Sequence, residues 1–214
     1  DGPFRVETRG ELEPATGSEW LHTNGAGAYA MSTLALMHTR RTHGVLVAAL
    51  DPPLDRHVML SHGEMALAVG GRSFRLSTHQ FPNIAPTPGY RNLRRFCQDP
   101  LPRWVYEIGG VRFERRIALV RGLNAVVLSY EWHGPEPAVL SIRPLMPFRP
   151  IHSLMCEHGA MVQRVNLRQG EVEVQPMAHP DGLLGLALCE QLGARLRVEL
   201  LQRTERLGDA GSVE

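Results

Sequence analysis

The sequence predicts an all-β protein, built as a large antiparallel sandwich of two sheets. Apolar and polar residues alternate along several segments, most clearly along 111–120 and 126–132. Pairs of turn-forming residues separate such segments, and no long segment carries an apolar stripe of helical period. Because alternation places successive side chains on opposite faces of a strand, these patterns favour short strands joined by tight turns.

The expected strands follow one another closely along the whole chain. They cover 27–36, 44–50, 57–67, 66–69, 72–76, 104–108, 111–120, 125–132, 139–145, 161–168, 171–175, 184–189 and 195–201. Gly70-Gly71, Gly109-Gly110 and Gln169-Gly170 fit two-residue hairpin loops between neighbouring strands. Roughly a dozen strands at hairpin spacing favour an antiparallel sandwich over a fold of parallel strands and crossover helices.

One segment interrupts this rhythm. Residues 81–102 contain five prolines and three arginines and show no strand pattern. A segment of that length in a compact domain predicts a functional loop, here an ordered one that covers one end or face of the sandwich. We expect the β-domain to span residues 1–201, and the polar residues 202–214 to be a tail, the start of a linker or a truncated element.

Composition and charge exclude several classes of protein. The chain has 214 residues with 23 basic and 22 acidic side chains, and every basic one is arginine. The near-zero net charge argues against nucleic acid as a partner, despite the group Arg91, Arg94 and Arg95. The absence of lysine excludes Schiff-base and P-loop lysine chemistry. Apolar runs such as 44–50 are too short to span a bilayer, so no membrane partner is expected.

Cysteine and histidine patterns give no metal or cofactor site. Cys97, Cys156 and Cys189 are widely spaced, which indicates reduced thiols in a cytoplasmic protein. The pairs His38/His43, His57/His62 and His152/His158 have zinc-like spacings, but none has the residues needed to complete a tetrahedral set. No nucleophile motif is present, and Asn24–Ala28 lacks the glycine spacing of a phosphate-binding loop. We therefore expect no metal, no cofactor and no catalytic residue.

The stretches 19–30 and 39–50 carry side chains suited to sugar hydroxyl groups. They supply the Trp20 indole, the Asn24 amide, the guanidinium groups of Arg40 and Arg41, and the His43 imidazole. A structural alternative is equally simple: Trp20 in the core, Asn24 in a turn and the arginines paired with carboxylates. Glu64, beside His62 in an apolar stretch, also stands out. It has no catalytic partner visible in the sequence, which favours a structural salt bridge to arginine.

These stretches carry a resemblance to a known family. EWLHTNGAGAYA and TRRTHGVLVAAL resemble the N-terminal domain of the bacterial and archaeal-type glycogen debranching enzymes, the amylo-α-1,6-glucosidases. Further matches follow in the family's order at 76–82, Gly89-Tyr90, Phe96, Asp99-Pro100, 102–107, 109–111, 143–145, 152–154 and 174–176. The sequence departs from the family at Thr42, where tyrosine is usual, and at Ala26 and Ala28, which replace the commoner leucine and glycine.

The resemblance implies a fold, a function and partners. The fold is the supersandwich, similar to galactose mutarotase. The complete enzyme removes α-1,6-linked glucose at glycogen branch points with a separate C-terminal (α/α)₆ toroid, before which this chain stops. We therefore expect a non-catalytic domain that packs on the toroid and helps to shape the site for glycogen or another α-glucan. The expected substrate-binding residues are Trp20, Asn24, Arg40, Arg41, His43, Glu64, Tyr90 and Arg94.

Other functions stay open from the sequence alone. The chain could be a free-standing α-glucan-binding module, or a purely structural or interaction domain. A third alternative is a mutarotase-like epimerase that acts through histidine and glutamate. Most arginines stand singly on the polar faces of strands. Two groups differ: Arg40-Arg41, and Arg91 with Arg94 and Arg95. We expect sugar or domain contacts at these two groups.

Overall fold

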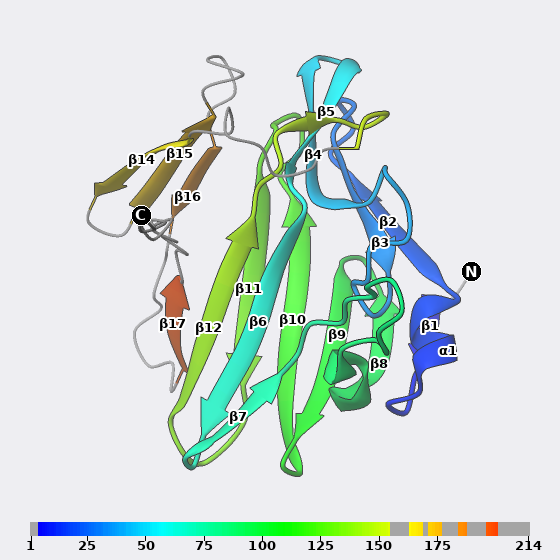
Figure 1. The fold of residues 1–214 in the computed structure, drawn as a ribbon, viewed down its shortest axis with the longest axis vertical. Helices are drawn as coiled ribbons and strands as arrows, with labels where there is room; N and C mark the ends of the chain where they lie inside the picture. The colour runs from blue at the N-terminus through cyan, green and yellow to red at the C-terminus, as the bar shows by residue number, and fades with distance from the viewer. Residues whose placement is uncertain (1–3, 155–162, 169–170, 177–183, 188–195, 201–214) are drawn as a thin grey trace, which may run out of the picture.

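A computed structural model describes residues 4–154, 163–168, 171–176, 184–187 and 196–200. These residues form strands in four sheets, which confirms an all-β sandwich (Figure 1). Sheet A contains β1 (Phe4–Glu7), β8 (Leu93–Gln98), β9 (Pro102–Ile108), β10 (Val111–Leu119) and β11 (Val126–Trp132). Sheet B contains β13 (Arg149–Pro150), β5 (Leu54–Leu60), β4 (Gly44–Asp51), β3 (Tyr29–Thr33) and β2 (Glu19–Thr23).

The remaining elements complete the fold. Sheet C contains β17 (Leu196–Leu200), β12 (Ala138–Leu145), β6 (His62–Val69) and β7 (Arg72–Arg75). Sheet D contains β14 (Gln163–Arg168), β15 (Glu171–Pro176) and β16 (Leu184–Ala187). The described helices are short: α1 (Leu12–Thr16) and the 3₁₀ helix η1 (Pro88–Asn92). Strand pairs are antiparallel except β12 with β17, which is parallel.

The glycine pairs make the predicted hairpins. Val69 pairs with Arg72 across Gly70-Gly71, and Ile108 pairs with Val111 across Gly109-Gly110. Gly109 and Gly110 both have positive φ angles, 59° and 83°. A two-residue hairpin turn of type I′ requires such angles at both central positions, and glycine adopts them without strain. Beyond the third predicted turn, Arg168 pairs with Glu171, as the sequence predicts.

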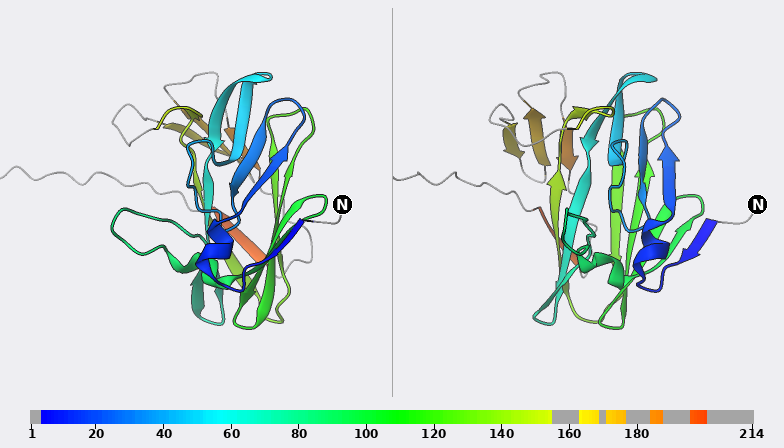
Figure 2. Two further views of the ribbon diagram at one scale, coloured as in Figure 1. Left: turned by 90° about the vertical axis from the view of Figure 1, so that its right-hand side faces the viewer. Right: turned by 45° about the vertical axis from the view of Figure 1, so that its right-hand side comes forward.

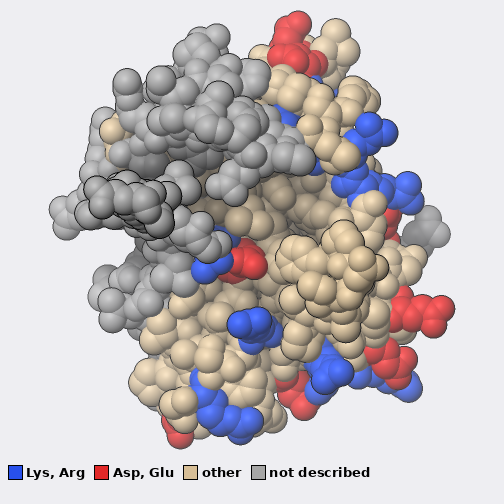
Figure 3. Space-filling view, in the orientation of Figure 1, with Lys and Arg blue, Asp and Glu red and all other residues tan. Residues whose placement is uncertain are grey.

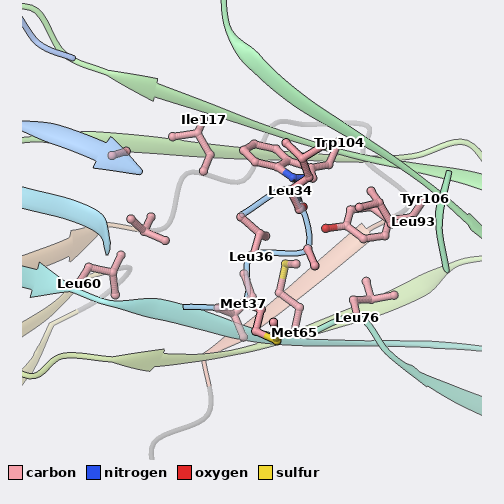
Figure 4. Close-up of a cluster of buried hydrophobic side chains, with 14 of the residues drawn as sticks. Leu34, Leu36, Met37, Leu60, Met65, Leu76, Leu93, Trp104, Tyr106 and Ile117 are labelled. Atoms are coloured by element: carbon pink, nitrogen blue, oxygen red, sulfur yellow. Dashed lines mark hydrogen bonds between the residues drawn. The ribbon is translucent and has the colours of Figure 1, made fainter. Parts of the chain in front are cut away.

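Sheets A and C stand opposite each other and enclose the main core (Figure 2). Phe113 and Ile117 project from β10 into this core, as the alternation predicts. Figure 4 shows that Leu34 and Leu36, which follow β3, lie between the layer that carries Trp104 and the other sheet. The indole Nε1 of Trp104 donates a hydrogen bond to the Leu34 carbonyl at 2.8 Å, so this segment is fixed inside the sandwich.

Two expectations about strands are wrong. Segment 81–102 is not free of strands, because β8 lies within it and pairs with both β1 and β9. The pairing register shifts between Leu93 and Arg95, and this irregularity conceals the alternation from a sequence pattern. The stretch 57–67 is not one strand either. The chain passes from β5 in sheet B to β6 in sheet C at Ser61.

Asparagine side chains lock one end of the sandwich. Asn24 Oδ1 accepts hydrogen bonds from the backbone amides of Ala26 and Ala28 at 2.8 and 3.0 Å, and its Nδ2 donates to the Leu123 carbonyl at 2.8 Å. Asn124 exchanges hydrogen bonds with the backbone of Ala49 at 2.8 and 3.1 Å. The loop after β2, strand β4 and the turn before β11 are therefore held together by two amides.

Replacing Asn24 by alanine is expected to lower the free energy of unfolding by about 1–3 kcal/mol, because the substitution leaves buried backbone groups without partners. Urea unfolding followed by circular dichroism measures the loss. Asn92→Ala is the matched control, since Asn92 also donates to a backbone carbonyl, that of Arg75, but at a solvent-accessible position. A change in Asn24→Ala no larger than in Asn92→Ala would contradict the locking role.

Several sequence expectations fall outside the described residues. These are the turn residues Gln169-Gly170, Cys156 and Cys189, His158, and the expected tail at 202–214.

Candidate functional site

A polar hollow lies on the face of sheet C that is turned away from the core. Glu64 and Ala66 on β6 pair with Arg143 and Ser141 on β12, whereas the alternate residues of both strands, such as Met65, enter the core. The hollow has a volume of about 320 Å³ and is lined by Glu64, Met65, Ala66, Arg75, Ser77, His79, Thr87, Ser141 and Arg143. Figure 3 shows a hollowed centre on this face, with a basic and an acidic side chain side by side.

Glu64 is the charged centre of the hollow. Its Oε2 accepts a hydrogen bond from Arg143 Nη1 at 3.1 Å, and its Oε1 lies 3.2 Å from His79 Nε2. The carboxylate is thus held from two sides, by a guanidinium from β12 and an imidazole from the loop after β7. Carboxylate and guanidinium groups at one wall offer both acceptors and donors to a polar ligand.

The loop 79–87 forms one rim of this hollow. The His79 amide donates to Thr87 Oγ1 at 2.7 Å, and the Thr87 amide donates to the His79 carbonyl at 2.9 Å, so the base of the loop is closed. Gln80 Nε2 donates to the Ile84 carbonyl across the loop at 2.9 Å. The loop projects from the sandwich (Figure 2) and leaves 51% of Phe81 exposed, with its ring centroid 6.0 Å from that of His79.

Imidazole rings connect the hollow to a second charged cluster. From His79, ring centroids follow at 5.0 Å to His62, 5.5 Å from there to His38, and 5.8 Å on to His43. We call these four residues the histidine row. At its far end His43 Nε2 lies 3.2 Å from Glu19 Oε1, which also accepts a hydrogen bond from Arg40 Nε at 2.6 Å.

Burial favours the neutral form of three members of the histidine row. It lowers the pKa of His38 to about 3, and the neighbouring His43 and His79 act in the same direction. Burial also lowers the pKa of His62 well below its ordinary value. The pKa of His43 is lowered by burial too, although the nearby Glu19 carboxylate opposes the shift. The imidazoles of His38, His43 and His62 are therefore uncharged at neutral pH.

The structure places four of the residues expected to bind substrate at or near the two ends of the histidine row. Glu64 lies in the hollow, and His43 and Arg40 stand at the far end of the histidine row. Arg41 is beside them in sequence, where its Nη1 donates to the His152 carbonyl at 3.0 Å and its own carbonyl accepts from Arg149 Nη2 at 2.6 Å. The imidazoles of His38 and His62 separate Glu64 from Arg40 and His43.

The other four expected residues occupy different surroundings. Trp20 is in the core, where its ring meets that of Trp104 edge-on at 4.9 Å. Asn24 is buried and holds its own loop. Tyr90 packs against the core from η1, and Arg94 donates to the Arg91 carbonyl at 2.8 Å. Trp20 and Asn24 therefore have the surroundings that their structural alternatives predict.

Sequence reasoning missed His38, His79 and Arg143 as site residues. His38 was considered only as part of a zinc-like pair, and His79 and Arg143 lie far from Glu64 in sequence. The sequence gives little indication of these three residues, because each reaches the hollow or the histidine row from a different segment of the chain. Only His62, two positions before Glu64, was visible locally.

A different cluster has metal-ligand atoms close together. Within the described part of the chain, Glu114, Glu131 and His133 place one ligand atom each within 4.8 Å of one another. Three arginines already surround the Glu114 carboxylate, and the nearest nitrogen atoms of two of them, Arg116 and Arg103, lie 2.6 and 3.7 Å from its oxygens; the third is Arg112. This concentration of positive charge opposes a metal cation.

The fold and the hollow define an antiparallel β-sandwich domain with a polar cavity on one sheet face. The family model described as glycogen debranching enzyme N terminal matches residues 18–187. The chain belongs to that family, and the resemblance read from the sequence is confirmed. No curated protein and no solved structure matches the chain. The described helices all lack the length and apolar character needed to cross a membrane.

Proposed function

We propose that this chain is the non-catalytic N-terminal domain of a glycogen debranching enzyme, and that the hollow on sheet C binds α-glucan. A separate helical-toroid domain carries out the hydrolysis of α-1,6-linked glucose in this proposal. The observation that carries it is the combination of a polar hollow, centred on Glu64, with the exposed ring of Phe81, whose centroid lies 6.0 Å from that of His79 in the lining. Membership of the family supplies the substrate class.

The chemistry of the hollow suits a sugar. Its volume of about 320 Å³ lies within the range of small-molecule sites. Glu64 accepts hydrogen bonds from hydroxyl groups, whereas Arg75 and Arg143 donate them. The apolar face of a glucose ring can rest on Phe81 while its hydroxyl groups face the hollow. Sugar recognition uses this pairing of an aromatic surface with convergent polar groups.

The same lining supports binding rather than hydrolysis. Glycoside hydrolysis normally needs two carboxyl groups on either side of the scissile bond. Among the described residues that line the hollow, Glu64 is the one carboxylate, and it is held by Arg143 and His79. One carboxylate does not supply the pair of groups that this reaction uses.

The end of the sandwich near Asn24 is the surface that we assign to the catalytic domain. Leu50, Leu54 and Leu123 are exposed there, on or beside segments that the two asparagines hold together. Exposed apolar side chains that gather on a rigid surface are typical of interfaces. We also place the protein in the cytoplasm, because the buried Cys97 is a free thiol.

Phe81→Ala is expected to weaken the binding of maltooligosaccharides by about fivefold, because stacking on an aromatic ring contributes about 1 kcal/mol. Glu64→Gln is expected to weaken the binding of maltooligosaccharides more than Phe81→Ala does, because it removes the charged hydrogen-bond acceptor. Isothermal titration calorimetry with a ladder of chain lengths measures both effects. Leu54→Ala is the matched control, since it removes an exposed apolar side chain from sheet B.

Two outcomes would count against this proposal. No heat with the unaltered chain at millimolar ligand would leave a scaffolding domain that binds no glucan. Binding that is equally tight in all three variants would place the glucan at another surface.

A further inference from the structure

Arg115 is a cation enclosed in the core of the sandwich. It lies on β10 among the residues that face sheet C, and its exposed fraction is 0%. The carbon atom of its guanidinium lies 5.7 Å from the ring centroid of Trp104 and 6.0 Å from that of Tyr130. Its Nη1 lies 3.9 Å from Met65 Sδ, on the opposite sheet. The group therefore spans the space between the two layers.

The carboxylates next to Arg115 on β10 and next to Met65 on β6 are turned away from Arg115. Glu114, the preceding residue on the strand, points to the opposite face, where arginines surround it. Glu64 precedes Met65 on β6 and likewise faces away, toward Arg143 and His79. Within the described ranges, Arg115 forms no ion pair.

The atoms of Arg115 that lack partners form one edge of the guanidinium. Nε and Nη2 are buried and have no hydrogen-bond partner, whereas Nη1 is the nitrogen directed at Met65. The hydrogen atoms on Nε and Nη2 point in the same direction and make the two-pronged fork that arginine uses to bind planar oxyanions. The hydroxyl group of Tyr130, whose ring contacts the guanidinium, is also buried without a partner.

This arrangement calls for a negative charge. An arginine side chain keeps its proton in proteins, so it cannot become neutral as a buried lysine can. A buried charge without a partner is strongly destabilising, because burial removes its hydration. Two parallel N–H groups match two oxygens of one planar group better than they match a spherical ion.

We propose that Arg115 binds a small planar oxyanion inside the sandwich, a free carboxylate such as formate or the bicarbonate ion. Nε and Nη2 donate to two oxygens of the ion, and the Tyr130 hydroxyl donates a further hydrogen bond. The aromatic faces of Trp104 and Tyr130 shield the ion pair from water. Met65 lies between this site and the proposed glucan hollow, because it contacts Arg115 and also belongs to the lining of the hollow.

Thermal unfolding of the chain in sodium formate, acetate or bicarbonate tests this proposal against sodium chloride and perchlorate at equal ionic strength. In the unaltered chain, Tm is expected to rise with formate or bicarbonate by about 5–10 °C at a concentration 100 times the dissociation constant. Arg115→Met removes the fork and is expected to abolish this rise. Arg121→Met, which removes an exposed arginine, is the matched control and is expected to retain it.

A second measurement covers the case in which Arg115→Met does not fold. Carbon-13 line broadening of labelled formate reports binding to the unaltered chain, and bicarbonate is expected to displace the formate whereas chloride is not. Equal displacement by chloride would overturn the proposal of a planar ion. The absence of any response to carboxylates would also overturn it, because the fork would then be satisfied by a carboxylate of the protein or by water. If Tm rises equally in Arg115→Met, the rise is a general effect of the salt and the proposal is overturned.

Discussion

Replacing Trp104 by alanine is expected to lower the free energy of unfolding by about 3–5 kcal/mol, the range observed when large aromatic side chains are removed from cores. Trp104 is fully buried, and its ring meets those of Trp20 and Phe96 at centroid distances of 4.9 and 5.0 Å. Its Nε1 also holds the carbonyl of Leu34. The substitution therefore creates a cavity and leaves a buried carbonyl without its donor at the same time.

Urea unfolding followed by far-ultraviolet circular dichroism measures this loss. Trp104→Phe separates the two contributions, because it keeps most of the ring but removes the hydrogen bond to Leu34. We expect Trp104→Phe to fall between the unaltered chain and Trp104→Ala. A loss below about 1 kcal/mol in Trp104→Ala would mean that the layers close over the site, contrary to the rigid packing described above.

Stability is expected to fall as the pH is lowered from 7 to 5. The pKa of His38 is about 3 in the folded protein and 6.5 in its ordinary state, so the unfolded chain binds a proton in this range that the folded chain excludes. The contribution of His38 to the free energy of unfolding is fully present above pH 6.5 and declines as the pH falls toward 3. At pH 5 His38 alone accounts for a loss of about 2 kcal/mol. The lowered pKa values of His43 and His62 act in the same direction.

Urea unfolding at half-unit pH intervals tests this dependence. His38→Asn is expected to flatten the profile between pH 7 and 5, because asparagine does not titrate. His133→Gln is the matched control, since His133 is at the surface and is not part of the histidine row. A profile that is unchanged in His38→Asn would contradict the burial of a neutral imidazole. The lowered pKa of Glu19, held by Arg40, affects stability only at more acidic pH.

The fold was predictable because its signals are local. Alternation along β10 and the glycines at 109 and 110 specify strand and turn within a few residues. The predictions fail where the structure depends on pairing between distant strands, which a local pattern does not report. A shift of register disguises β8, and the passage from β5 to β6 changes sheets at Ser61 without a proline or a pair of glycines to mark it.

The candidate site was predictable only in part. Residue chemistry suggested Trp20 and His43 for sugar contacts, but chemistry does not report burial, and both side chains are enclosed. The hollow assembles from β6, β12 and the loop after β7, so no single segment displays it. Arg115 is different, because its position between Phe113 and Ile117 already places it on the apolar face of its strand. Alternation alone could have identified this buried cation.

The two asparagines that lock the end of the sandwich also constrain the order of assembly during synthesis. Asn24 bonds to the backbone at Leu123, and Asn124 bonds to that of Ala49, so these contacts join segments far apart in sequence. A nascent chain cannot complete this end until the turn before β11 has left the ribosome. Contacts of such long range slow folding and prolong the exposure of apolar surface. Until then, the β4–β5 hairpin, which carries the exposed Leu50 and Leu54, lacks its contacts with the turn before β11. We therefore expect a chaperone to bind the nascent chain at this hairpin.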